Sequence, residues 1–157
     1  MERVLIKERV DARFIISWRF DAAMEVKTIS QTVTFKADPK EVFSAYMDAK
    51  KHAAFTGDKA VIENKAGGRF SAYGGGLHGW TLELVPGKRI VQAWRCDEDG
   101  WPADFYSTVI FTFKKVRGGT QLDFVQHGVP AECVKSISEG WHAYYWEPMK
   151  ELLTKNQ

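Results

Sequence analysis

The residue types that most often carry catalysis or metal binding are few in this sequence and widely spaced. No two histidines have the His-Glu-x-x-His spacing that brings two imidazoles to one helix face for zinc, and no Cys-x-x-Cys pair occurs. No serine lies in the Gly-x-Ser-x-Gly context of a nucleophile elbow. We therefore expect no catalytic residue, no metal site and no cofactor. The histidines and cysteines considered are His52, His78, His127, His142, Cys96 and Cys133.

Two further motifs suggest chemistry but have simpler interpretations. The run Gly74-Gly75-Gly76 is similar to a phosphate-binding loop, but it joins two predicted strands and opens no helix, so it lacks the helix N-terminus that binds phosphate. Arg95 and the acidic segment 97–99 precede Trp101 at a predicted strand end. We interpret the glycine run as a hairpin loop and the acidic segment as a solvated loop.

Aromatic side chains are the strongest compositional bias. The chain has six tryptophans, ten phenylalanines and five tyrosines among its 157 residues. Rings in such numbers favour a large core, or a cavity lined by rings. The sequence alone leaves both interpretations open.

A small set of polar side chains is predicted to face the same interior as these rings. Strand alternation places Gln92 on the face of Ile90 and Gln126 on the face of Phe124, with Ser107 facing inward on its own strand. A buried amide without a partner costs roughly 1–3 kcal/mol, so these groups require partners. Those partners are either the polar groups of a bound ligand or a buried water or backbone group.

The rings and the polar set together predict a pocket for a small hydrophobic molecule between a sheet and a long helix. The candidate pocket residues are Phe43, Tyr46, Phe70, Trp80, Gln92, Trp94, Trp101, Phe105, Ser107, Val109, Phe124, Gln126, Trp141 and Tyr145.

Strands are predicted from two-residue alternation. In the segment 25–36, small polar residues alternate with Ile29, Val33 and Phe35, and the β-branched content is typical of a strand. The segment 105–115 alternates most clearly, and Gly118-Gly119 predicts a hairpin turn after it. Further strands are predicted at 60–64, 69–73, 78–85, 88–96 and 120–126.

Two short helices are predicted after the first strand. Asp38, Pro39 and Glu41 form a helix start, with Asp38 as N-cap, proline at the first helical position and Glu41 completing a capping box. A second helix over residues 49–55 ends before Gly57.

The C-terminal segment 132–154 is predicted to form one long amphipathic helix. Gly140 weakens a helix interior, so we expect a close backbone contact there, and Pro148 predicts a kink near Tyr144. The apolar residues recur at three- and four-residue spacing: Val134, Ile137, Trp141, Tyr145, Met149 and Leu152.

The element order predicts an α+β fold with a curved antiparallel sheet of about seven strands wrapped around the long C-terminal helix. The length suits one domain, which we place at residues 24–157. Residues 1–23 sustain neither a two-residue nor a 3.6-residue period. We expect them to be a poorly ordered N-terminal extension, or an extra arm or weak strand.

Composition narrows the possible partners. With 45% hydrophobic residues, 27% charged residues and a net charge of +2, the sequence gives no reason to expect nucleic acid. No segment approaches the ~20 apolar residues of a membrane span, so no membrane insertion is expected. Two cysteines without metal-type spacing suggest free thiols in the cytoplasm, with a single disulfide as the alternative. The oligomeric state is left open.

Several short motifs resemble one known family. The element order resembles the START-like, birch-pollen-allergen-like helix-grip superfamily. Within it, the motifs resemble the C-terminal domain of the activator of the heat-shock protein 90 ATPase. The resemblance covers residues 26–153. Its matching residues are Gly67-Gly68-Arg69-Phe70, Gly79, Leu84-Val85-Pro86, Lys88, Ile90-Val91, Trp94-Arg95, Trp101-Pro102, Thr108, Phe113, Gly128-Val129-Pro130, Gly140-Trp141 and Tyr144-Tyr145.

The resemblance implies a helix-grip fold. Our first expectation is a non-catalytic binding domain of this fold that holds a small hydrophobic ligand. The alternative, which the resemblance implies, is a module that binds an Hsp90-type chaperone and stimulates its ATPase. The third is an enzyme, such as a cyclase or hydrolase, that uses the same cavity. The eukaryotic activators carry a separate N-terminal domain that supplies most of the chaperone contact, and the resemblance does not extend to it.

Overall fold

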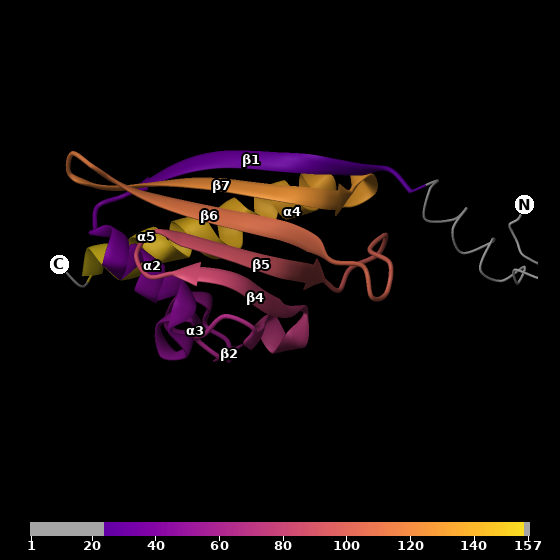
Figure 1. Ribbon diagram of the computed structural model, residues 1–157, viewed down its shortest axis with the longest axis horizontal. Helices are drawn as coiled ribbons and strands as arrows, with labels where there is room; N and C mark the ends of the chain where they lie inside the picture. The colour runs from indigo at the N-terminus through magenta and orange to yellow at the C-terminus, as the bar shows by residue number, and fades with distance from the viewer. Residues whose placement is uncertain (1–23, 156–157) are drawn as a thin grey trace, which may run out of the picture.

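The computed structural model describes residues 24–155, so the expectation for residues 1–23 falls outside the described residues. The described chain contains a seven-stranded antiparallel sheet in the order β1-β7-β6-β5-β4-β3-β2 (Figure 1). Its strands are β1 (Val26–Phe35), β2 (Val61–Ile62), β3 (Arg69–Ala72), β4 (Leu77–Val85), β5 (Arg89–Cys96), β6 (Ser107–Val116) and β7 (Gly119–Pro130). Its helical segments are α2 (Pro39–Met47), α3 (Ala49–Thr56), η1 (Tyr73–Gly75), η2 (Ala131–Cys133), α4 (Val134–Trp141), η3 (His142–Trp146) and α5 (Glu147–Lys155).

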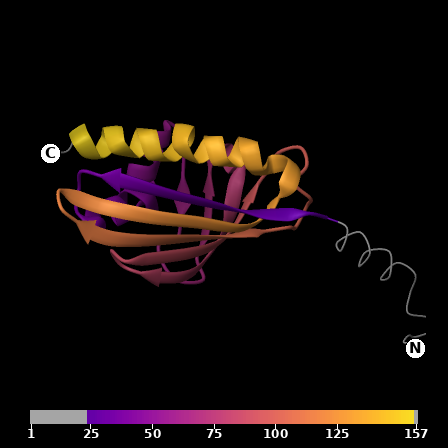
Figure 2. The same cartoon turned by 90° about the horizontal axis from the view of Figure 1, so that it is seen from above.

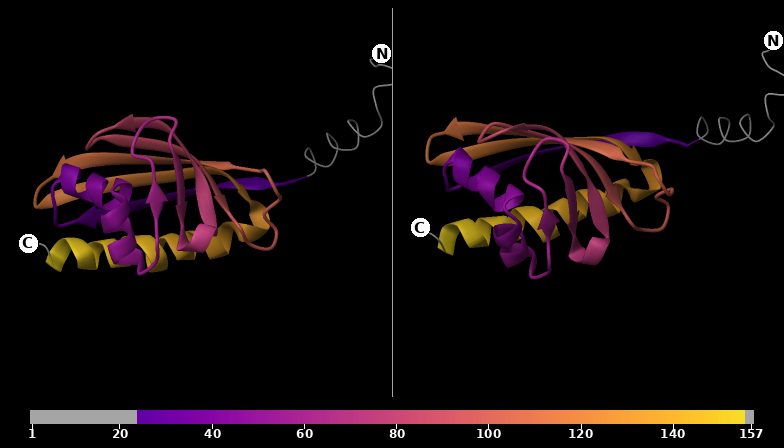
Figure 3. Two further views of the ribbon diagram at one scale, coloured as in Figure 1. Left: turned by 90° about the horizontal axis from the view of Figure 1, so that it is seen from below. Right: turned by 60° about the horizontal axis from the view of Figure 1, so that its bottom comes forward.

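The sheet and the C-terminal helical run form two layers. The run from α4 to α5 lies along one face of the sheet (Figure 2). The sheet curves around this run, and α2 and α3 lie beside α5 at one end (Figure 3). The predicted α+β fold, with a curved sheet wrapped around a long C-terminal helix, is confirmed.

Alternation fixes which side chains meet the helix. On β6, Val109 and Phe111 are fully buried, and Phe111 lies opposite Phe124 of β7 in the ladder. On β1, Ile29 and Val33 are buried in the same way. Successive strand residues point to opposite faces, so these residues form one apolar inner face.

The start of α2 differs in detail from the prediction. Asp38 is the N-cap and Pro39 the first helical residue, as expected, but the Asp38 side chain makes no capping hydrogen bond. Its Oδ1 instead accepts a hydrogen bond from Lys115 Nζ at 2.5 Å. The capping-box prediction is therefore wrong. In α3, by contrast, Asp48 Oδ1 does cap, since it accepts a hydrogen bond from the Lys51 amide at 3.0 Å.

The C-terminal helical run contains a π-helical turn where the sequence predicts a kink. The segment η3 lies between α4 and α5 and ends directly before Glu147 and Pro148. The wider turn shifts the apolar stripe by one residue, so Tyr145 and Trp146 are both buried. Beyond it, Leu153 is buried, and Leu152 is only partly buried.

The core lies between the inner sheet face, the helical run and α2. Trp141, Trp146, Phe111 and Phe124 are among its largest fully buried side chains, and their rings contact one another. Of the described helices, none is both long and apolar enough to cross a membrane.

Candidate functional site

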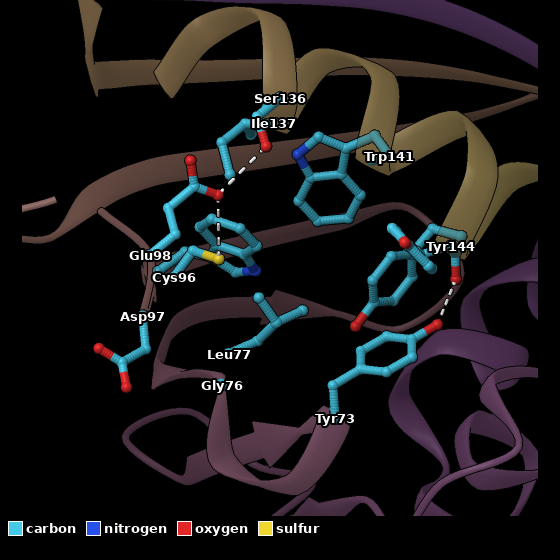
Figure 4. Close-up of a pocket in the computed structure, with 13 residues that line it drawn as sticks. Tyr73, Gly76, Leu77, Cys96, Asp97, Glu98, Ser136, Ile137, Trp141 and Tyr144 are labelled. Atoms are coloured by element: carbon cyan, nitrogen blue, oxygen red, sulfur yellow. Dashed lines mark hydrogen bonds between the residues drawn. The ribbon is translucent and has the colours of Figure 1, made fainter. Parts of the chain in front are cut away.

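A pocket of about 350 Å³ opens between the C-terminal helical run and the ends of β4 and β5 (Figure 4). Figure 4 shows Glu98 at one end and Tyr73 at the other, with Trp141 and Leu77 between them. Most of the wall is apolar and aromatic. The lining residues are Tyr73, Gly76, Leu77, Trp94, Cys96, Asp97, Glu98, Ser136, Ile137, Gly140, Trp141, Tyr144 and Tyr145.

Tyr73 is held in the pocket wall by an unusual backbone conformation and by a hydrogen bond of its side chain. It has a φ of 51°, in the left-handed region that costs a non-glycine residue roughly 1–2 kcal/mol. Its hydroxyl donates a hydrogen bond of 2.8 Å to the carbonyl of Tyr144. That carbonyl lies four residues before Pro148, which has no N–H to donate to it. The hydrogen bond from Tyr73 thus fixes the loop after β3 against the π-helical turn.

Tyr145 joins the pocket to a buried polar network. Its hydroxyl lies 3.0 Å from His52 Nε2, and His52 Nδ1 lies 2.8 Å from the carbonyl of Tyr46. The Tyr46 hydroxyl donates to Gln92 Oε1 at 2.8 Å. Burial lowers the pKa of His52 and raises the pKa of Tyr145 well above 10. These groups therefore stay neutral at pH 7 and hold the ring of Tyr145 in place.

Glu98 closes the other end of the pocket. Its Oε1 accepts a hydrogen bond of 3.3 Å from the Ser136 hydroxyl and a longer contact of 3.7 Å from the Cys96 thiol. Burial, together with the neighbouring Glu98 carboxylate, raises the pKa of Cys96 to about 12. The thiol thus stays protonated at neutral pH, and it is not an activated nucleophile.

The predicted inward polar side chains are bonded to the protein itself. Gln126 Nε2 donates to Ser107 Oγ at 2.9 Å, and Gln126 Oε1 accepts from Trp141 Nε1 at 2.8 Å. Ser107 donates in turn to the carbonyl of Trp94 at 2.8 Å. Gln92 Nε2 donates to Thr81 Oγ1 at 3.2 Å. The two amides thus take neither of the expected kinds of partner: they hydrogen-bond to other side chains of the protein and fix the floor beneath the rings.

The structure brings only part of the predicted set to the pocket. Trp94, Trp141 and Tyr145 line it. The other inward-facing members belong to the core or its margin beneath the helical run: Phe43, Tyr46, Phe70, Gln92, Trp101, Phe105, Ser107, Val109, Phe124 and Gln126. None of these ten residues lines the pocket.

Trp80 lies on the opposite face of the sheet. It pairs across the ladder with Ala93, which alternates with the inward-facing Gln92 and Trp94. Its ring packs against Tyr106 at 5.0 Å and beneath the Arg69 guanidinium at 5.2 Å. Gly79, which pairs with Trp94, faces inward instead. Only glycine fits at position 79, because a Cβ there would lie 1.8 Å from the Ala93 carbonyl oxygen.

The sequence prediction missed the loop residues of the pocket. Tyr73 and Leu77 flank the glycine run, which is the hairpin loop that the sequence predicts. Glu98 belongs to the acidic segment that we expected to be solvated, but it is half-buried against α4. The three consecutive glycines beside an aromatic residue were the available signal, since they permit the left-handed backbone that turns Tyr73 toward the helix.

One buried donor in the wall has no partner. Among the described residues, no acceptor lies within hydrogen-bond distance of Trp94 Nε1, which is inaccessible from the pocket. Its ring packs edge-to-face with Trp101 at 5.8 Å and against Trp141 at 5.3 Å. The ring of Trp94 therefore contributes apolar surface to the pocket and no hydrogen-bond donor.

Comparisons with known proteins agree on one family. Residues 36–154 match the family described as Activator of Hsp90 ATPase homolog 1-like protein. The Activator of 90 kDa heat shock protein ATPase homolog of Dictyostelium discoideum is 36% identical over 117 residues, which cover 73% of this chain and 30% of that protein. The Homo sapiens homolog 1 is 33% identical over 118 residues, covering 75% of this chain and 34% of that protein. The aligned region thus spans about a third of each curated relative.

A solved structure supports the fold independently. The crystal structure of an HSP90 activator from Plasmodium falciparum superposes with a TM-score of 0.74 at 24% identity, over 81% of this chain and 96% of that one. This likeness concerns the fold alone. The family match over residues 36–154 shows that the chain belongs to the family of Activator of Hsp90 ATPase homolog 1-like proteins.

Proposed function

We propose that this chain is a non-catalytic binding domain that holds a small hydrophobic molecule in the pocket between β4, β5 and the C-terminal helical run. The observation that carries this proposal is the pocket of about 350 Å³ walled by the rings of Tyr73, Trp94, Trp141, Tyr144 and Tyr145. Ligand pockets of roughly 300–1,000 Å³ with mostly apolar walls are typical of small-molecule sites. The hydrogen bonds behind these rings keep the pocket formed without a ligand.

The state of the polar groups in the wall supports binding over catalysis. The Cys96 thiol has a pKa of about 12, and burial raises the pKa of Tyr145 well above 10. A general acid or base works best with a pKa near the operating pH, which neither group has. The family description also names an activator of an ATPase and not a catalyst.

Native mass spectrometry of the freshly purified protein, with a denatured control, tests the proposal. A non-covalent adduct that disappears on denaturation identifies the ligand by its mass. Titration with the neutral fluorescent probe N-phenyl-1-naphthylamine tests the pocket directly.

Two matched variants test whether the probe binds in this pocket. Tyr144→Ala removes a ring that is 59% exposed at the pocket wall, and it should weaken probe binding. Tyr106→Ala removes a ring from the outer face of the sheet, and it should leave binding unchanged. Absence of both an adduct and probe binding, or equal effects of the two variants, would contradict the proposal.

A second candidate function follows from the relatives. Curated proteins that are 33% and 36% identical to this chain are named activators of the 90 kDa heat shock protein ATPase. We propose as the alternative that this chain binds an Hsp90-type chaperone and stimulates its ATPase. The chaperone's ATP hydrolysis rate, measured with and without this chain, tests the alternative. Stimulation that survives Tyr144→Ala but not charge reversal on the surface favours this role over the pocket.

A further inference from the structure

Most hydrogen-bond donors in the pocket wall are already used by the protein. The Tyr73 hydroxyl donates to the carbonyl of Tyr144, the Ser136 hydroxyl donates to Glu98, and the Trp141 indole donates to Gln126. The Cys96 thiol also points at Glu98. The loop amides are committed as well, since Gly76 N donates to the carbonyl of Tyr73 and Asp97 N donates to that of Gly76.

The direction of the Tyr145 hydrogen bond follows from the chemistry of His52. A carbonyl oxygen only accepts, so the His52 Nδ1 that faces the Tyr46 carbonyl at 2.8 Å carries the proton. Burial lowers the pKa of His52, so the ring is neutral at pH 7 and its Nε2 is an acceptor. Tyr145 must therefore donate to His52, and its oxygen offers only lone pairs in any other direction.

Two hydrogen-bond donors remain in the wall, the Trp94 indole and the Tyr144 hydroxyl, and neither is offered to a ligand in the enclosed part of the pocket. Trp94 Nε1 is buried and inaccessible from the pocket. Tyr144 is 59% exposed and belongs to the rim of the pocket, not to its enclosed part. The polar atoms that the enclosed part of the pocket presents are therefore acceptors.

Glu98 adds a negative charge that no basic side chain among residues 24–155 compensates. None of the thirteen lining residues is lysine, arginine or histidine. The nearby Arg95 donates to the carbonyls of Trp101 and Pro102 and lies 3.6 Å from Asp97. Across residues 24–155, no basic side chain forms an ion pair with Glu98, which receives only the neutral donors Ser136 and Cys96.

We infer that the pocket selects an organic cation, an ammonium group attached to an apolar body. An ammonium group supplies the donors and the positive charge that the acceptors and Glu98 lack, and aromatic faces attract cations directly. The apolar body fits between Leu77 and Trp141, in the middle of the pocket, and extends toward Tyr73 at the end opposite Glu98 (Figure 4). This inference rests on the proposed function, because it names the class of ligand for the same pocket.

Three probes of nearly equal size test the inference by isothermal titration calorimetry. They are 2-naphthylmethylamine, which is protonated at pH 7, the neutral 2-naphthylmethanol and the anionic 2-naphthoate. The amine should bind about tenfold more tightly than the alcohol, and the naphthoate most weakly.

Two charge-neutralising variants test the role of Glu98. Glu98→Gln keeps an acceptor for Ser136 and Cys96, and it should remove the preference for the amine while leaving binding of the alcohol unchanged. Glu139→Gln removes one negative charge from α4, outside the pocket. It should leave the preference intact, and thermal unfolding should show both variants folded.

The outcomes separate the inference from the proposed function. If the alcohol or the naphthoate binds as tightly as the amine, or if Glu98→Gln keeps the preference, the inference is overturned and the proposed pocket remains. If none of the three probes binds the folded protein, and N-phenyl-1-naphthylamine also fails to bind, both are overturned.

Discussion

The hydroxyl of Tyr73 donates a hydrogen bond of 2.8 Å to the carbonyl of Tyr144. Tyr73 lies in the loop between β3 and β4, and Tyr144 lies in the π-helical turn. The carbonyl lies four residues before Pro148, which has no backbone N–H to give to it. The hydrogen bond from Tyr73 thus links the helical run to the loop that forms the far end of the pocket.

This relationship predicts an energetic coupling between positions 73 and 148. Tyr73→Phe keeps the ring and removes the hydroxyl, so it should lower the free energy of unfolding by about 1 kcal/mol. In a Pro148→Ala background the new amide can donate to the Tyr144 carbonyl, so the same change should cost only about 0.3 kcal/mol. Urea unfolding of the four proteins measures both costs. Equal costs in the two backgrounds would show that the carbonyl does not depend on Pro148.

We predict that a substitution at Gly140 stabilises the fold and weakens binding in the pocket. A Cβ added there would meet only Tyr144 Cδ2, at an ordinary 3.6 Å, so the close backbone contact expected from the sequence is absent. Gly140→Ala should raise the free energy of unfolding by about 0.5–1 kcal/mol, because alanine favours the helix. It should also weaken probe binding, because the methyl group enters the pocket. Glu139→Ala, one residue away and outside the pocket, should leave binding unchanged, and unaltered binding by Gly140→Ala would contradict the prediction.

We predict that replacing Gln126 lowers the free energy of unfolding, because a buried donor loses its acceptor. Gln126→Leu leaves the indole N–H of Trp141 without its acceptor, and an unsatisfied buried donor costs about 1–3 kcal/mol. We expect the free energy of unfolding to fall by about 2 kcal/mol in chemical denaturation. Gln121→Leu changes a glutamine on the other face of the same strand and should cost less than about 0.5 kcal/mol. A loss no larger at Gln126 than at Gln121 would mean that Trp141 finds another partner.

His52 predicts a pH dependence of stability in mildly acidic solution. Burial lowers its pKa below 6.5, and the hydrogen bond to the Tyr46 carbonyl opposes this shift only in part. Well above pH 6.5 neither the folded nor the unfolded chain binds this proton, so the free energy of unfolding is unaffected. Below pH 6.5 the unfolded chain takes up a proton that the folded chain excludes, so the free energy of unfolding falls until the folded pKa is reached.

The slope from one such proton is at most about 1.4 kcal/mol per pH unit. Urea unfolding of the parent protein between pH 7.5 and 5.5 should show this decline. The His52→Gln variant should show a smaller one, because it cannot titrate there. His78→Gln changes a more exposed histidine and should keep the parent slope. Parallel slopes for the parent and His52→Gln would exclude His52 as the source.

The sheet was predictable because its strands have a strong two-residue period. Phe111 and Phe113 alternate with threonine and isoleucine on β6, and this pattern alone assigns the buried face. The partner of the Asp38 side chain was not predictable, because Lys115 is distant in sequence and reaches it only through the fold. The π-helical turn was likewise missed, since Pro148 indicates a disturbed helix without saying how the helix responds.

The pocket was harder to predict than the fold because loops form its two ends. Trp94, Trp141 and Tyr145 were found because they lie on regular elements with a defined inner face. Tyr73 and Glu98 lie beyond the ends of strands, where periodicity gives no direction. Their positions depend on which loop meets the helix, and only the three-dimensional structure supplies that information.

The π-helical turn also makes the chain length in this segment critical. A π-helical turn is equivalent to an α-helix that has gained one residue. If η3 closed into a regular α-helix with the same number of residues, α5 would rotate by about 100° relative to α4. Met149 and Leu153, both buried now, would then turn away from the core. Deletion of one residue within η3 would instead restore regular α-helical geometry with both residues still facing the core, so homologous chains that share this packing should have either the π-helical turn or one residue fewer in this segment.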